Sequence, residues 1–131
     1  MWNGQKITVV MPAYDAALTL ERTLREVDRQ VVDDIILVDD ASRDDTVEVA
    51  RRLGLRTLVH PRNRGYGGNQ KSCYTEALRT GADIVVMLHP DYQYTPRLLP
   101  AMASMIAMTP SENASSRPLV MGLGCRGGGG R

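Results

Sequence analysis

The 131-residue sequence lacks several features that mark particular classes of protein. No apolar run approaches the roughly 18 residues that cross a membrane, and the first residues show no signal-peptide pattern. The formal net charge is only +1, so no strong positive field favours nucleic acid as a partner. The two cysteines, Cys73 and Cys125, form no spacing motif, which favours reduced thiols over a disulfide. Together these absences predict a cytoplasmic protein without a transmembrane segment or a nucleic-acid partner.

The composition fits one globular domain that can bury a core. Hydrophobic residues make up 43% of the chain and charged residues 24%, which is ordinary for such a domain. Short apolar runs alternate with segments in which apolar residues recur at helical spacing. We expect strands at residues 7–11, 35–38, 57–59, 84–88 and 119–121, and helices at residues 15–29, 42–53, 68–80 and 96–105. This alternation predicts an α/β fold with a Rossmann-like, mainly parallel sheet flanked by helices.

Several residues mark the boundaries of these elements. Pro12 is expected to end the first strand, and Ser42 with Asp45 resembles a capping box that opens the second helix. Gly54 stands where the C-terminal glycine of that helix belongs. Residues 127–130 are all glycine and cannot fold by themselves. We therefore expect a domain over residues 1–126 and a short truncated tail over residues 127–131.

Polar clusters follow three of the predicted strands. They are Pro12-Ala13-Tyr14-Asp15, Asp39-Asp40-Ala41-Ser42 and His89-Pro90-Asp91. Each cluster alone has an ordinary explanation as a turn, a helix cap or a solvated loop. In a parallel sheet, however, the carboxyl ends of the strands share one edge, where ligands bind. The three clusters together therefore favour a functional site at that edge.

The third cluster has the chemistry of a metal site. In extended chain, residues two apart point to the same side, so His89, Asp91 and Gln93 could converge on one ion. All three side chains offer oxygen or nitrogen lone pairs that suit Mn²⁺ or Mg²⁺. The pattern is thus typical of a divalent metal site.

Four motifs occupy residues 9–14, 36–46, 63–68 and 88–94. In this order they resemble the motifs of the inverting, nucleotide-sugar-dependent family 2 glycosyltransferases. The resemblance covers the chain from Lys6 to about Arg126 and is closest to the polyprenyl-phosphate sugar transferases, such as dolichyl-phosphate mannosyltransferases. It implies a GT-A fold and the transfer of a sugar from a UDP- or GDP-sugar to an acceptor such as a polyprenyl phosphate.

The resemblance also implies roles for residues of the nucleotide site. Pro12 and Tyr14 would flank the nucleobase, and Asp40 would accept a hydrogen bond from a base N–H. Asp39 would instead brace its loop. Arg62, Arg64 and Lys71 surround a glycine-rich turn and could meet phosphate oxygens, although a solvated basic face explains them equally well. The nucleotide-binding residues implied in this way are Pro12, Tyr14, Asp15, Val38, Asp40 and Arg64.

The metal motif carries further implications. Asp91 corresponds to the second acid of the family's Asp-x-Asp motif, Gln93 would be an auxiliary ligand, and His89 replaces the first acid. Mg²⁺ or Mn²⁺ held there would neutralise charge on the departing nucleoside diphosphate. The acceptor class further implies a cytoplasmic protein peripheral to the inner face of the membrane.

The sequence also departs from the family pattern. The catalytic base of the family lies in a later acidic segment, but no Asp or Glu follows Glu112, so no catalytic residue is assigned. We therefore expect an incomplete GT-A domain that represents the nucleotide-binding half of a transferase. A nucleotide-sugar binding module or an inactive relative is the alternative. A third reading is a nucleotidyltransferase or a Rossmann-type cofactor protein. The cofactor protein is disfavoured, because the first strand turn has no glycine fingerprint.

Overall fold

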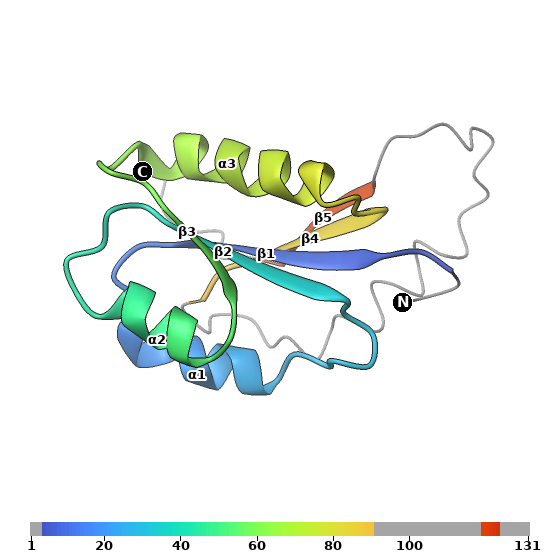
Figure 1. Cartoon of the computed structure of the whole chain (residues 1–131), viewed down its shortest axis with the longest axis horizontal. Helices are drawn as coiled ribbons and strands as arrows, with labels where there is room; N and C mark the ends of the chain where they lie inside the picture. Colours follow the sequence, from blue (N-terminus) through green and yellow to red (C-terminus); the bar gives the residue numbers. More distant parts are fainter. Residues whose placement is uncertain (1–3, 91–118, 124–131) are drawn as a thin grey trace.

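A computed structural model describes residues 4–90 and 119–123. Within these residues, three helices and five strands alternate along the chain (Figure 1). The strands are β1 (Ile7–Ala13), β2 (Asp34–Asp39), β3 (Arg56–Val59), β4 (Ile84–Leu88) and β5 (Leu119–Leu123), and the helices are α1 (Ala17–Arg25), α2 (Thr46–Arg52) and α3 (Gly65–Arg79). The predicted α/β fold is confirmed.

The strands form one sheet with the order β3-β2-β1-β4-β5, and every neighbouring pair is parallel. The chain moves outward from β1 through β2 to β3, and α3 then carries it back to β4 on the other side of β1. Helices α1 and α2 cover one face of the sheet, and α3 covers the other (Figure 1). The winding direction reverses between β1 and β4, and ligands of open α/β sheets bind at such switch points.

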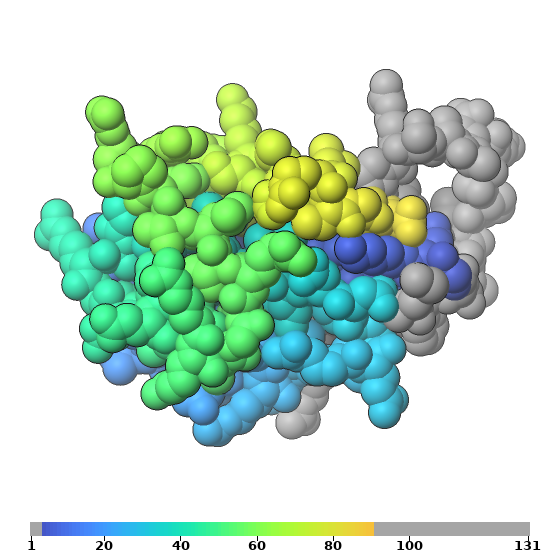
Figure 2. Space-filling view, in the orientation of Figure 1, coloured from blue at the N-terminus to red at the C-terminus, as the bar shows by residue number. Residues whose placement is uncertain are grey.

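Both faces of the sheet are buried, which explains why its strands read as continuous apolar runs. Alternate residues of β1 point to opposite faces. Val9 and Met11 pack on the side of α1 and α2, whereas Val10 packs with Cys73 and Ala77 on the side of α3. In the space-filling view, the α3 segment lies along the top of the molecule and α1 and α2 lie below (Figure 2).

Pro12 does not end β1 as predicted, but lies within it and pairs with Val38 of β2. The carbonyl oxygens of Ile7 and Ala13 accept hydrogen bonds from the β2 side, so the backbone of Pro12 faces the β4 side. Pairing with β4 ends at Val10. The missing N–H of Pro12 therefore costs no hydrogen bond in the sheet.

The predicted capping box of α2 is wrong. The helix begins at Thr46, and Asp45 at the N-cap position makes no side-chain capping bond. The carboxylate of Asp44 instead accepts from the backbone N–H of Thr46. Ser42 is occupied elsewhere, because its backbone N–H and hydroxyl both donate to the carboxylate of Asp39. Local competition between neighbouring Asp and Ser side chains thus moves the start of the helix.

Helix α3 begins at Gly65, three residues before the predicted start at Gly68. The backbone N–H groups of Arg64 and Gly65 donate to the carboxylate of Asp40, which is 24 and 25 residues away in sequence. This distant carboxylate satisfies donors that a helix terminus otherwise leaves unpaired. The extra turn therefore depends on a tertiary contact that local sequence does not reveal.

The remaining boundaries differ less. Helix α1 is shorter than predicted at both ends, since it begins at Ala17 and its C-cap residue is Glu26. The helix predicted at residues 96–105 lies outside the described residues. In the part of the chain that is described, no helix has the length and apolar character needed to cross a bilayer.

Substitutions at two glycines test whether a positive φ at Gly54 requires glycine. Gly54 follows the C-cap of α2 with a φ of +79°, and nothing lies within 4 Å of the position that a Cβ would take. Gly54→Ala should lower the free energy of unfolding by about 1 kcal/mol, because an L-residue disfavours the left-handed region. Urea denaturation of the purified chain measures this loss.

Gly67 provides the matched control, because it lies in α3 without a positive φ and also has nothing within 4 Å of a Cβ. Gly67→Ala should raise the free energy of unfolding by about 0.5–1 kcal/mol, since alanine restricts the unfolded chain. A loss of stability in both variants would contradict the conformational explanation.

Candidate functional site

The carboxyl ends of β1 and β2 and the start of α3 enclose a pocket of about 240 Å³. Its position beside the switch point agrees with the sheet edge predicted for the site. Three of the predicted nucleotide-binding residues line it, namely Pro12, Tyr14 and Asp40. The full lining is Pro12, Ala13, Tyr14, Asp40, Asn63, Gly65, Tyr66 and Asn69.

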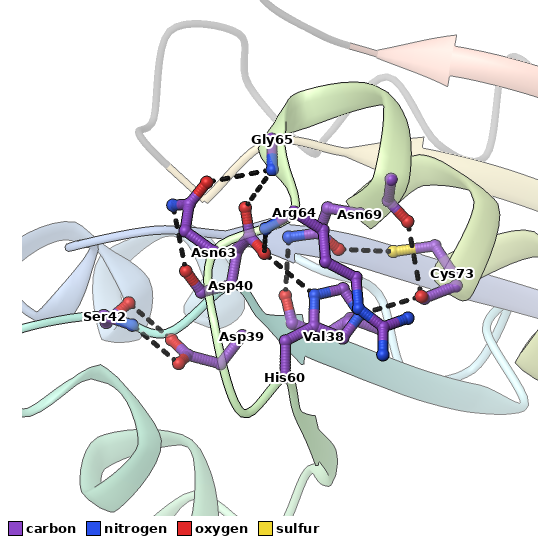
Figure 3. A network of polar contacts seen from close by, with 12 residues as sticks. Val38, Asp39, Asp40, Ser42, His60, Asn63, Arg64, Gly65, Asn69 and Cys73 are labelled. Carbon is purple, nitrogen blue, oxygen red and sulfur yellow. Dashed lines mark hydrogen bonds and ion pairs between the residues drawn. The ribbon is translucent and has the colours of Figure 1, made fainter.

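The turn after β2 is held by Asp39. Its carboxylate accepts hydrogen bonds from the backbone N–H and the hydroxyl of Ser42, and Ala41 between them has a φ of 61° (Figure 3). An alanine in this region costs roughly 1 kcal/mol, so the bonds to Asp39 sustain an otherwise unfavourable turn. The bracing role predicted for Asp39 is confirmed.

Asp15 connects the loop after β1 to the loop after β2. Its backbone N–H donates to the hydroxyl of Ser42, and its carboxylate accepts from the backbone N–H of Arg43. Asp15 has a φ of 50°, which Asp tolerates better than most residues. The side chain of Asp15 thus holds two loops together beside the pocket and is not among the residues that line it.

The carboxylate of Asp40 lies at the centre of the polar network (Figure 3). Oδ1 accepts from the backbone N–H of Arg64 at 2.7 Å and lies 2.8 Å from Nδ1 of His60. Oδ2 accepts from the backbone N–H of Gly65 at 3.0 Å. Asp40 is only 3% exposed. This carboxylate therefore joins β2 to the end of β3 and the start of α3.

The surroundings of Asp40 favour its ionised form. Burial on its own raises the pKa of Asp40, but the hydrogen bonds from Arg64, His60 and Gly65 outweigh burial and lower that pKa. The N-terminus of α3 acts in the same direction, because its partial positive charge stabilises a nearby anion. Asp40 is consequently a carboxylate at neutral pH and can only accept hydrogen bonds.

His60 was not predicted from the sequence as a site residue. It follows β3 and is 6% exposed, with Nε2 lying 2.7 Å from the hydroxyl oxygen of Ser72 on α3. Its place at a strand end was the one signal that could have drawn attention to it. Its partners are 20 and 12 residues away, so sequence spacing could not reveal them.

Two asparagines complete the wall on the side of α3. Asn63 donates from Nδ2 to the backbone oxygen of Asp40 and accepts from the backbone N–H of Gly65. Asn69 donates to the backbone oxygen of Val38 at 3.0 Å. The side chain of Val38 packs in the core below α3, so Val38 contributes its backbone and not its side chain to this region.

Aromatic rings lie at two places around the pocket. Tyr14 is 47% exposed and Tyr66 is 55% exposed, and both line it. The ring of Tyr66 stacks on His89 at a centroid distance of 5.3 Å, and its hydroxyl oxygen lies 2.8 Å from Nε2 of His89. Tyr66 thus links the pocket to the end of β4. The sequence prediction missed this role, although Tyr66 stands inside the third motif.

Arg64 contributes its backbone to the site, whereas its side chain lines a separate groove with Lys71 and Ser72. A Cβ at Gly68 would lie only 2.8 Å from Cβ of Arg64, so glycine is required where this side chain passes over α3. The structure therefore does not bring the side chain of Arg64 together with Pro12 and Tyr14. Arg64 and Lys71 share this groove with Glu76, and their contact with phosphate stays a prediction.

The predicted metal ligands are only partly described. His89 follows β4 beside Tyr66, while Asp91 and Gln93 lie outside the described residues. Across residues 4–90 and 119–123, His, Cys, Asp and Glu form no group of three that could hold a metal ion. Cys73 is also no ligand candidate, since it is buried, and burial raises the pKa of its thiol to about 12. The metal site stays a prediction.

Comparisons with known proteins agree with this architecture. An uncharacterized protein of Methanocaldococcus jannaschii is 32% identical over 95 residues, which cover 72% of this chain and 39% of that protein. The UDP-N-acetylglucosamine--dolichyl-phosphate N-acetylglucosaminyltransferase of Methanococcus voltae is 26% identical over an alignment of 107 residues, and the match covers 69% of this chain and 43% of that enzyme. The chain thus spans about two fifths of the length of these relatives.

A solved structure gives the same result for the fold. Glucosyl-3-phosphoglycerate synthase from Mycobacterium tuberculosis, in complex with Mn²⁺, UDP and glucosyl-3-phosphoglycerate, matches with a TM-score of 0.67 and 26% identity. The match covers 80% of this chain and 40% of that chain. The parallel sheet and the strand-end pocket define a domain of the GT-A type. The model of the family described as "Glycosyl transferase family 2" matches residues 8–118, and the chain belongs to that family.

Asp40→Asn should destabilise the fold at pH 7 by about 1–3 kcal/mol, because it replaces charged hydrogen bonds of a buried group. The lowered pKa of Asp40 contributes stability that is present above the unfolded-state pKa of about 3.9 and is lost as the pH falls through the folded-state pKa. The difference between wild type and Asp40→Asn should therefore shrink below about pH 4. Urea denaturation at pH 7 and pH 3 measures both effects.

Asp45→Asn serves as the control, because Asp45 is exposed and its side chain makes no capping bond. It should change the free energy of unfolding by less than about 0.5 kcal/mol. An Asp40→Asn penalty of the same size at both pH values would show that charge on Asp40 is not what stabilises the network.

Proposed function

We propose that this domain binds a nucleoside-diphosphate sugar together with a divalent metal ion and serves in the transfer of the sugar to an acceptor. The observation that carries the proposal is the pocket at the carboxyl ends of β1 and β2, where Tyr14 offers an exposed ring and Asp40 a buried acceptor. An aromatic face and a carboxylate suit a flat heterocycle with N–H groups at its edge. Membership of glycosyl transferase family 2 supports the same reading.

The roles of the pocket residues follow from their placement. We propose that the ring of Tyr14 stacks on the nucleobase and that Pro12 borders the same space. Asp40 accepts from a base N–H, while Asp15 and Val38 act by fixing the loops and the backbone around the base. Arg64 contributes through its backbone bond to Asp40.

A metal ion fits the donors at the other end of the site. His89 lies after β4, and its ring is stacked on Tyr66, which lines the pocket. One imidazole, one carboxylate and one amide oxygen from His89, Asp91 and Gln93 form a donor set that suits Mn²⁺ or Mg²⁺. The ion would neutralise negative charge on the nucleoside diphosphate as it departs. The mycobacterial relative, which was solved with Mn²⁺ and UDP, supports this assignment.

The backbone around Asp40 strengthens the case for a metal. The amides of Arg64 and Gly65 at the start of α3 donate to Asp40, so they cannot also hold the ligand's phosphates. A diphosphate therefore needs compensating charge from another part of the site. A divalent ion held at the end of β4 would supply it.

The acceptor and the stereochemical course belong to the same proposal. We propose inverting transfer, with a polyprenyl phosphate as acceptor. The name of the Methanococcus voltae relative, which transfers N-acetylglucosamine to dolichyl phosphate, supports that acceptor class. Because the chain spans about two fifths of its relatives, donor binding and sugar transfer are best tested separately.

Isothermal titration calorimetry with UDP and GDP tests the binding step. With Mn²⁺ present, at least one nucleotide should bind at least about tenfold more tightly than with EDTA, a difference of roughly 1.4 kcal/mol. The physical reason is that the metal offsets repulsion between the phosphates and nearby carboxylates. Equal binding with Mn²⁺ and with EDTA would remove the metal from the proposal.

Asp91→Ala tests the ligand assignment. It should weaken Mn²⁺-dependent nucleotide binding by at least about tenfold and leave metal-free binding unchanged. Asp83→Ala is the matched control, since Asp83 lies just before β4 at the opposite end of that strand. If Asp91→Ala binds normally while Asp40→Ala does not, the metal assignment fails and the base pocket alone survives.

A further inference from the structure

His60 lies between the pocket and the outer groove and belongs to neither lining. Its Nδ1 is 2.8 Å from Oδ1 of Asp40, and its Nε2 is 2.7 Å from the hydroxyl oxygen of Ser72. A buried imidazole with a defined partner on each nitrogen is held in one orientation. The roles proposed above do not use it.

The partners also decide where the ring proton lies. Asp40 can only accept hydrogen bonds, so Nδ1 of His60 carries the proton and donates it to Oδ1. Nε2 lies 2.7 Å from the hydroxyl oxygen of Ser72, and that hydroxyl donates to the backbone oxygen of Gly68 at 3.3 Å. Ser72 therefore holds the imidazole in the orientation that directs Nδ1 at Asp40.

Counting acceptor positions shows what Asp40 still offers. An ionised carboxylate has about four lone-pair positions. The amide of Arg64 and Nδ1 of His60 take the two on Oδ1, and the amide of Gly65 takes one on Oδ2. One acceptor position remains on Oδ2, in a residue that lines the pocket.

We propose that His60 is a positioning residue that keeps Asp40 a pure acceptor, so that the pocket takes a nucleobase through a ring N–H and rejects cytosine. This inference rests on the proposed nucleotide-sugar function. Uracil and guanine carry an N–H in the ring, whereas N3 of cytosine presents a lone pair where uracil has its N3–H. A lone pair directed at a buried carboxylate is repelled and leaves both acceptors unpaired.

The role of His60 follows from what its loss would do. Without the Nδ1–H donor, Oδ1 of Asp40 would be a buried anionic oxygen with one bond fewer. Such a carboxyl group takes up a proton more readily or turns to find another donor. A protonated Asp40 can donate to N3 of cytosine, so the pocket would lose its discrimination.

The test compares UDP with CDP, which share the ribose and the diphosphate and differ only on the base. Calorimetry of the 131-residue chain with Mn²⁺ should give wild-type binding of UDP at least about tenfold tighter than that of CDP. His60→Phe, which fills the ring volume without a donor, should bring the ratio to within about threefold. His60→Asn, which keeps an N–H donor near Nδ1, should restore most of the ratio.

Thr75→Ala is the matched control, because it removes an exposed hydroxyl from the same helix as Ser72. It should leave the UDP-to-CDP ratio unchanged. Ser72→Ala should lower the ratio by about threefold, since His60 then loses the partner that holds its ring in place. This variant leaves His60 in place. It therefore tests the positioning role of His60 if thermal melting shows that His60→Phe does not fold.

The outcomes separate the two proposals. Wild-type binding of CDP as tight as that of UDP overturns the base selection and leaves the nucleotide-binding function standing. An unchanged ratio in folded His60→Phe, or in Ser72→Ala where the Phe variant does not fold, overturns the role of His60. Failure of the wild-type chain to bind UDP, GDP or CDP with Mn²⁺ overturns the proposed function and this inference together.

Discussion

The buried carboxylate of Asp40 is the constraint on which the site depends. A charge removed from water is tolerated only when hydrogen-bond donors replace the water, and the chain supplies them from Arg64, His60 and Gly65. These donors belong to the segment between β3 and α3, while Asp40 follows β2. Losing any one of these bonds leaves a buried charge less well solvated. The bonds therefore fix the carboxyl ends of β2 and β3 and the start of α3 relative to one another.

The same carboxylate also determines what the glycine-rich turn at the start of α3 binds. A glycine-rich segment at a helix N-terminus often cradles a phosphate, because the helix dipole and the unpaired amides both favour an anion. Here the anion is part of the protein, since Asp40 takes the amides of Arg64 and Gly65. Glycine has a separate use at Gly68, where the side chain of Arg64 passes close to α3. The turn is thus a joint between strand and helix.

The sequence predicted the sheet well because its signal is local. Continuous apolar runs mark strands that are buried on both faces, and polar clusters after them mark the edge where Pro12, Tyr14 and Asp40 meet. What the sequence did not show depends on contacts across the fold. The start of α3 at Gly65, the link from His60 to Asp40 and the stacking of Tyr66 on His89 join residues 20 or more apart. The error at α2 has another origin. Ser42 bonds to Asp39 while Asp44 accepts from the backbone N–H of Thr46, and sequence spacing alone does not decide which neighbouring polar side chain bonds the start of the helix.

Two left-handed residues show how the loops of the site are held without a hydrophobic core of their own. Asp15 and Ala41 adopt φ values of 50° and 61° in the loops that follow β1 and β2. For Ala41 this geometry costs roughly 1 kcal/mol, and only compensating bonds can maintain it. Those bonds run from Ser42 to Asp39 and from Arg43 to Asp15, so each loop is fixed by a carboxylate that accepts from the other loop or from its own turn. Hydrogen bonds of this kind set the direction of the chain more closely than apolar packing does, because they require particular donor–acceptor geometry. Loops fixed in this way present Tyr14 and Asp40 to the pocket before any ligand arrives, and the ordering cost of binding is correspondingly smaller.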